Sequence, residues 1–89
     1  MSTATLWDEP QATARVFASM QRIHILEQHA LRLLDTSPQE RVRLEACAAL
    51  LDLQRAEGTV HDSPTRHVLT DIEDRLDAVT RRLAGLCRA

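Results

Sequence analysis

Four histidines and two cysteines are the side chains of this sequence best suited to bind a metal ion. His24 and His29 are five residues apart, which turns them about 140° from one another around a helix, so they do not share a face. No two histidines have the i and i+4 spacing, and neither cysteine belongs to a Cys-x-x-Cys pair. The spacing therefore predicts no metal site on a single element, and no cofactor is expected.

A site assembled in three dimensions from His61, His67 and Cys47 is the metal-binding arrangement that the spacing leaves open. In the other interpretation, Cys47 is a small buried residue and Cys87 is a thiol close to the C-terminus. His67 is expected in the first turns of a helix, whereas a phosphorelay histidine usually lies in mid-helix on an exposed face. The hypothesis that remains for these residues is a small metal or ligand sensor.

Motifs for catalysis are absent from the sequence. It has no Gly-rich phosphate loop, no paired carboxylates in a recognisable motif, and no Ser, His and acid arrangement that stands out. An acidic cluster is interpreted as a solvated helix face, with docking of a basic partner as the alternative: Asp71, Glu73, Asp74 and Asp77. We therefore expect a protein that is not an enzyme.

Charge and hydropathy narrow the class of protein further. The formal net charge is −2, so no general attraction to nucleic acid is expected. No apolar run approaches the ~20 residues that span a bilayer, so no membrane segment is predicted. The first ten residues contain neither a basic residue nor an apolar stretch, which is unlike a secretory signal. With two widely separated cysteines, the expected location is the reducing cytoplasm.

Hydrophobic periodicity predicts one all-α domain over residues 1–89. Apolar residues make up 44% of the chain, yet there is only one Trp, one Phe and no Tyr, so the core must be aliphatic. An aliphatic core of this kind suits packed helices better than a sheet. The expected helices are three, long and antiparallel, over about 9–34, 38–57 and 64–87.

Capping residues mark the expected ends of these helices. Asp8, Ser37 and Ser63 each precede a proline by one or two residues, which is typical of an N-cap with Pro in the first turn. Ser37 and Glu40 also fit a capping box. Gly58 is the expected C′ residue that ends the second helix.

The third helix carries the most regular apolar pattern of the chain. Aliphatic residues recur along it at alternating spacings of three and four: Leu69, Ile72, Leu76, Val79, Leu83 and Leu86. This pattern is a heptad seam suited to knobs-into-holes packing. The seam must be buried against the same chain or against another.

The second helix is apolar on two opposite sides, and the functional prediction depends on this feature. One side holds Leu44, Cys47, Ala48 and Leu51, and most of the other holds Val42, Ala46, Ala49, Leu50, Leu53 and Ala56. A helix of this kind is usually covered on both sides. We therefore expect an open layer with the second helix in the middle, or a bundle completed by oligomerisation; an ordinary monomeric bundle is the alternative.

Three segments resemble a known family. The stretch LWDEPQATARVFASM resembles the opening of the helical N-terminal domain of bacterial peptide-chain release factors, where a Trp, acidic residues, Pro and Ala precede a long helix. ALLDLQRAEG and DIEDRLDAVTRRLAGL are similar to later helices of that domain. The chain has no Gly-Gly-Gln tripeptide and no codon-reading domain. The resemblance thus implies a similar antiparallel helical layer and not peptide release.

The expected function is that of a non-enzymatic protein–protein interaction module. It would be a small adaptor, a secretion-type chaperone, or a phage- or host-encoded inhibitor that docks on a larger assembly, with a His/Cys sensor as the alternative. The partner, a protein or a second copy in a homo-oligomer, is expected on the second and third helices. The predicted interface residues are Val42, Ala46, Ala49, Leu50 and Leu53, with Leu69, Ile72, Leu76, Val79, Leu83 and Leu86.

Overall fold

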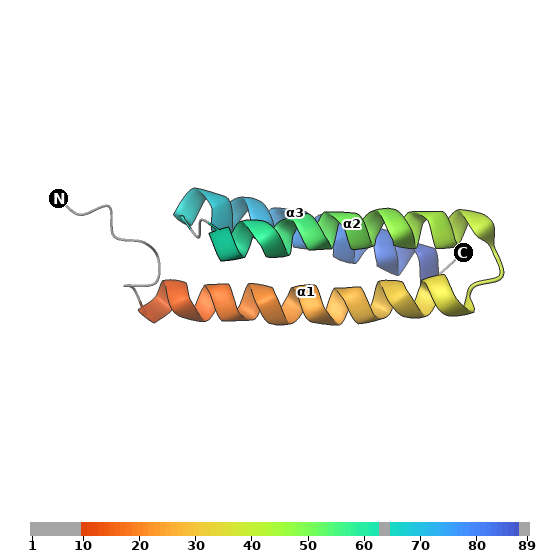
Figure 1. Cartoon of the computed structure of the whole chain (residues 1–89), viewed down its shortest axis with the longest axis horizontal. Coiled ribbons are helices and arrows are strands. Elements are labelled where there is room, and N and C mark those ends of the chain that lie inside the picture. The colour runs from red at the N-terminus through yellow and green to blue at the C-terminus, as the bar shows by residue number, and fades with distance from the viewer. Residues whose placement is uncertain (1–9, 63–64, 88–89) are drawn as a thin grey trace.

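The computed structural model describes residues 10–62 and 65–87. They form three helices, α1 (Pro10–Thr36), α2 (Glu40–Asp62) and α3 (Arg66–Cys87). Figure 1 shows that all three run along one long axis, with α2 antiparallel to both α1 and α3. The predicted all-α fold is confirmed.

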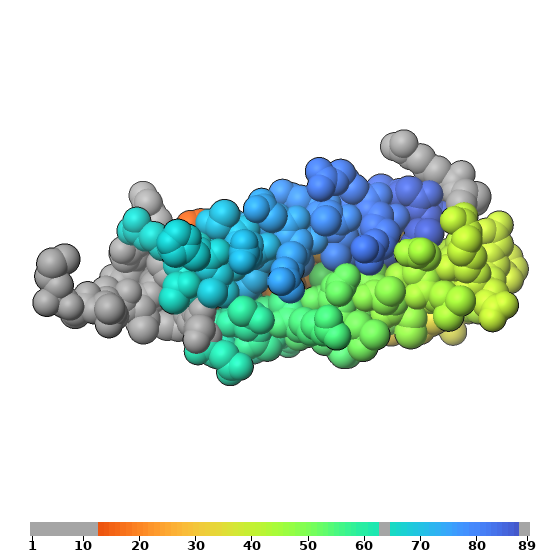
Figure 2. All heavy atoms as spheres, turned by 90° about the horizontal axis from the view of Figure 1, so that it is seen from above, coloured from red at the N-terminus to blue at the C-terminus, as the bar shows by residue number. Residues whose placement is uncertain are grey.

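The three helices form a bundle in which each one packs against the other two. Because α1 and α3 touch directly, α2 is not the middle of an open layer, and the expectation of such a layer is wrong. Figure 2 shows α2 and α3 lying side by side along the molecule, with α1 almost wholly hidden behind them. The bundle leaves one side of each helix facing outward.

The hydrogen bonds at the helix starts agree in part with the predicted caps, because Ser37 accepts an amide hydrogen bond as an N-cap does. The Gln39 amide donates to Ser37 Oγ at 3.3 Å, and α2 begins at Glu40, two residues later than expected. At α3, the Val68 amide donates to Thr65 Oγ1 at 3.2 Å, so Thr65 caps this helix. The predicted caps at Asp8 and Ser63 lie outside the described residues.

Gly58 does not end the second helix. α2 continues through it to Asp62, and Gly58 does not have a positive φ, which a C′ residue of this type would need. The extension buries Val60, which is only 1% exposed. Burying a valine contributes roughly 1.5–3 kcal/mol, whereas a glycine inside a helix costs about 1 kcal/mol. Tertiary packing therefore outweighs the local stop signal.

Aliphatic side chains from all three helices fill the core. The buried residues of α1 are Val16, Ser19, Ile23, Leu26 and Ala30; those of α2 are Val42, Ala46, Ala49, Leu53, Ala56 and Val60; those of α3 are Leu69, Ile72, Leu76, Val79 and Leu83. On α2 the core side is rich in alanine, and small side chains let neighbouring helices approach closely. The heptad seam of α3 is thus buried against its own chain.

Charged contacts join α3 to its neighbours on both sides. The Arg15 guanidinium donates from Nε and Nη2 to the two carboxylate oxygens of Glu73, at 3.2 and 2.5 Å. Arg22 lies two turns after Arg15 on α1, and it donates to Asp77, one turn after Glu73 on α3, at 2.8 Å. Toward α2, Arg82 donates to Asp52 at 3.4 Å. The first two pairs link the parallel helices α1 and α3, and the third links α3 to α2.

Candidate interaction surface

The residues predicted as a partner interface lie in the core of the folded chain. Those of α2 are buried, except for the half-buried Leu50, and those of α3 are buried, except for the half-buried Leu86. Leu53 and Leu76 are both 0% exposed. In the folded chain the buried residues of this set are covered by the other helices, and only Leu50 and Leu86 are partly exposed, so the predicted set is not a free surface.

The other apolar side of α2 faces outward. Leu44 is 64% exposed and Leu51 is 57% exposed, and the exposed Cys47 and Ala48 lie between them. We call these four residues the outer face of α2. The sequence pattern shows both apolar sides of this helix, and the partner was expected on the side that the folded chain buries. The buried side carries three alanines at helical spacing, Ala46, Ala49 and Ala56, which suit the crowded centre of a bundle.

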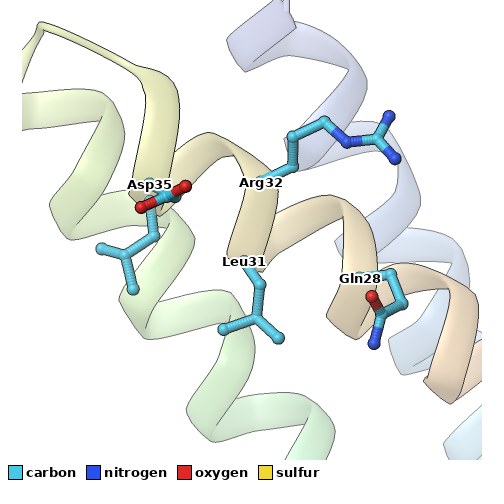
Figure 3. A pocket seen from close by; sticks show the side chains of 5 residues that line it. Gln28, Leu31, Arg32 and Asp35 are labelled. Carbon is cyan, nitrogen blue, oxygen red and sulfur yellow. The ribbon is translucent and has the colours of Figure 1, made fainter.

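α1 also carries exposed apolar side chains, but they do not form a row. Phe17, Ile25 and Leu31 are each exposed and are separated along the helix by polar residues. Figure 3 shows Leu31 between Gln28 and Asp35, with Arg32 extending to the opposite side of the ribbon. The hollow at Leu31 is lined by residues of α1 only, so it is a depression in one helix surface.

A histidine of α1 meets the cysteine that ends α3. His29 Nε2 lies 3.1 Å from Cys87 Sγ, within hydrogen-bonding distance. Cys87 also lines a hollow beside the α1–α2 turn, together with Ser37 and Val42. The two residues are 58 positions apart, so no spacing in the sequence pointed to this contact. Only the parallel packing of α1 and α3 brings them together.

The metal site left open by the sequence is not assembled. Cys47 and His61 belong to the same helix, and a rise of 1.5 Å per residue separates them by about 21 Å along it. In the part of the chain that the structure describes, no group of three or more His, Cys, Asp or Glu is placed to hold a metal ion. Both cysteines are free and exposed, so the expectation of a buried Cys47 is wrong.

Glu27 and Arg15 each have a perturbed pKa. Burial raises the pKa of Glu27, the nearby charge of Glu57 raises it further, and His24 acts in the opposite direction. The hydrogen bonds from Arg15 to Glu73 raise the pKa of Arg15. Among the described residues, Glu27 forms no ion pair.

The acidic cluster of α3 is divided between two roles. Glu73 and Asp77 form ion pairs with arginines of α1. Asp71 and Asp74 are exposed. Half of the cluster thus belongs to the α1–α3 contact, which leaves a weaker acidic surface for a basic partner than the sequence pattern suggested.

Comparison with models of known protein families, with curated proteins and with solved structures finds no match for this chain. Among residues 10–62 and 65–87, no helix combines the length and apolar character of a bilayer-spanning segment. The outer face of α2 is a contiguous row of exposed apolar residues on the described surface.

Proposed function

We propose that this protein is a non-enzymatic protein–protein interaction module that binds its partner on the outer face of α2. The observation that carries the proposal is the row of exposed apolar residues from Leu44 to Leu51, on a helix whose opposite side is already packed. Single exposed apolar residues are normal on protein surfaces. A contiguous row over two turns is typical of a binding surface.

The expected contribution of this row is large enough to hold a helical partner. Each fully buried leucine contributes roughly 1.5–3 kcal/mol, and Leu44 and Leu51 are both more than half exposed. Cys47 and Ala48 between them are small, so a partner helix lying along α2 would meet no obstruction. An adaptor, a chaperone and an inhibitor would each use the face in this way.

The two free thiols support a location in a reducing compartment as part of the same proposal. Cys47 and Cys87 are both exposed and unpaired with one another. Exposed free cysteines are more compatible with the cytoplasm than with an oxidising compartment. The cytoplasmic location is thus proposed together with the binding role.

A double substitution, Leu44→Glu with Leu51→Glu, tests the proposal. Both positions are exposed, so the variant is expected to keep wild-type helicity by circular dichroism and to lose association with itself or with a partner from the native cell. Ile25→Glu is the matched control, because Ile25 and Leu51 are each 57% exposed. If the double variant and the wild type behave alike in sedimentation and in partner capture, the outer face of α2 is not the binding surface.

A metal or ligand sensor is the second candidate, and the contact between His29 and Cys87 favours it. Imidazole and thiolate are both ligands of zinc and of softer metals. Calorimetric titration with Zn²⁺ of the wild type and of His29→Ala tests this function. Absence of binding by the wild type would rule it out for zinc.

A further inference from the structure

We infer that the partner on the outer face of α2 is a second copy of this chain, with the two α2 helices antiparallel about a two-fold axis between Cys47 and Ala48. This inference rests on the proposed function and adds the identity and orientation of the partner. It is carried by the order of the residues along the exposed side of α2. Read from either end, the order is a leucine, two small residues and a leucine. An acidic residue lies beyond one end of this row, and a basic residue lies beyond the other.

The apolar residues of the outer face are placed symmetrically about its centre. Leu44 and Leu51 are equally far from the midpoint between Cys47 and Ala48. In an antiparallel pair centred there, Leu44 of one copy faces Leu51 of the second copy, and the contact occurs twice. An isologous two-fold interface requires this self-complementarity, because one surface must fit itself.

Small residues occupy the position where the two helices would come closest. Cys47 and Ala48 are both exposed and lie at the centre of the row. Helix axes in proteins are about 8–10 Å apart, depending on the side chains at the contact. Small side chains permit the shorter separation, at which the leucines on either side of the centre can interdigitate.

Charged residues at the two ends of the row determine the orientation. Glu40 lies one turn before Leu44, and Arg55 lies one turn after Leu51; both are exposed. Within residues 10–62 and 65–87, neither side chain forms an ion pair. In the antiparallel pair, Glu40 of one copy meets Arg55 of the second copy, again twice. A parallel two-fold pair would place Glu40 against Glu40 and Arg55 against Arg55, which like-charge repulsion disfavours.

The size of the face indicates a weak and reversible dimer. From Glu40 to Arg55 the helix extends about 22 Å at 1.5 Å per residue. One helix face of this length lies at the lower end of the interfaces that form specific complexes. We therefore expect dissociation on dilution into the micromolar range.

Sedimentation velocity over a concentration series, together with charge exchange, tests the inference. The wild type is expected to change from monomer to dimer as concentration rises, and Ile25→Glu is expected to behave in the same way. Leu51→Glu is expected to remain a folded monomer. Glu40→Arg and Arg55→Glu are each expected to weaken the dimer several-fold, because each creates two like-charge contacts. The double variant Glu40→Arg with Arg55→Glu is expected to recover the wild-type dimer.

A second readout uses the position of Cys47 beside the two-fold axis. In Cys87→Ser, Cys47 is the remaining thiol, and its alkylation by N-ethylmaleimide is expected to slow as the concentration rises into the range where the dimer forms, because the second copy covers it. The reagent adds the thiol across its double bond, so no oxidant is needed. This protection is expected to be lost in Leu51→Glu, whose Cys47 is unchanged.

Three outcomes would overturn the inference. They are a wild type that stays monomeric at every concentration, a dimer that is unaffected by Leu51→Glu, and single charge variants whose effects the double variant does not reverse. The wild type could instead stay monomeric and capture a different protein that the Leu44→Glu and Leu51→Glu double variant does not capture. That result would reject a second copy as the partner and would support the proposed function. If that double variant keeps both its self-association and its capture of a partner, the inference and the proposed function are both rejected.

Discussion

His29 Nε2 lies 3.1 Å from Cys87 Sγ, although the two residues are 58 positions apart in the chain. The imidazole is placed to accept the thiol proton, and a base in this position assists attack by sulfur on an electrophile. Cys47 is also exposed but has no hydrogen-bonded histidine among the described residues. The chain therefore contains a thiol with a neighbouring imidazole and a reference thiol without one.

His29→Ala is expected to slow the alkylation of Cys87 by iodoacetamide several-fold and to leave the rate at Cys47 unchanged. Mass spectrometry of the two cysteine peptides over time gives both rates in one sample. The reaction is run below the concentration at which self-association is expected, so that Cys47 is accessible. Equal slowing at both cysteines would indicate a change in the fold and not the loss of a local base.

Replacement of Glu27 is expected to change the pH dependence of stability. Burial and Glu57 raise the pKa of Glu27 above its ordinary value of 4.5. The folded chain then binds this proton more tightly than the unfolded chain, so ionisation opposes folding. The penalty is absent below the ordinary pKa, develops as pH rises through the folded value, and is fully present at neutral pH.

Glu27→Gln is therefore expected to raise the melting temperature slightly at neutral pH and to have little effect below the ordinary pKa. Thermal unfolding at both pH values, compared with the wild type, measures the difference. Asp74→Asn is a suitable control, because Asp74 is an exposed carboxylate of α3. If Glu27→Gln raises the melting temperature equally at acidic and neutral pH, the ionisation of Glu27 is not the cause of the increase.

Two leucines on opposite sides of α2 are expected to respond differently to truncation. Leu53 is 0% exposed, and Leu51 is 57% exposed. Leu53→Ala removes packed core atoms and is expected to lower the free energy of unfolding by about 2–5 kcal/mol. Leu51→Ala is expected to change it by less than about 0.5 kcal/mol. Urea unfolding of both variants, at low concentration, tests which side of the helix faces the core, and a reversed order would contradict the bundle.

Gly58 offers a test of where α2 ends. Its backbone has no positive φ, and apart from the neighbouring residues and backbone of its own helix, a Cβ added there would meet nothing within 4 Å. Gly58→Ala is therefore expected to stabilise the helix by about 0.5–1 kcal/mol. For a small domain, 1 kcal/mol corresponds to a rise of roughly 4–8 °C in Tm. A fall in Tm would mean that Gly58 has the left-handed conformation of a C′ residue.

The helical class and the number of helices were predictable from the amino-acid sequence. Apolar residues at spacings of three and four, with few aromatic residues, favour packed helices, and the α3 seam from Leu69 to Leu86 was recognisable without coordinates. Periodicity is a local property, so these elements are visible in the chain alone. The ends of helices were less well predicted: at Gly58, burial of Val60 outweighs the local stop signal.

Which apolar side of α2 lies inside depends on the packing of the three helices. Both sides have helical spacing, and the choice depends on how closely α1 and α3 approach, which the small side chains of Ala46 and Ala49 permit on one side. The contact of His29 with Cys87 and the ion pair of Arg15 with Glu73 also depend on packing, because each joins residues 58 positions apart. Spacing along one helix carries no information about the register between two helices.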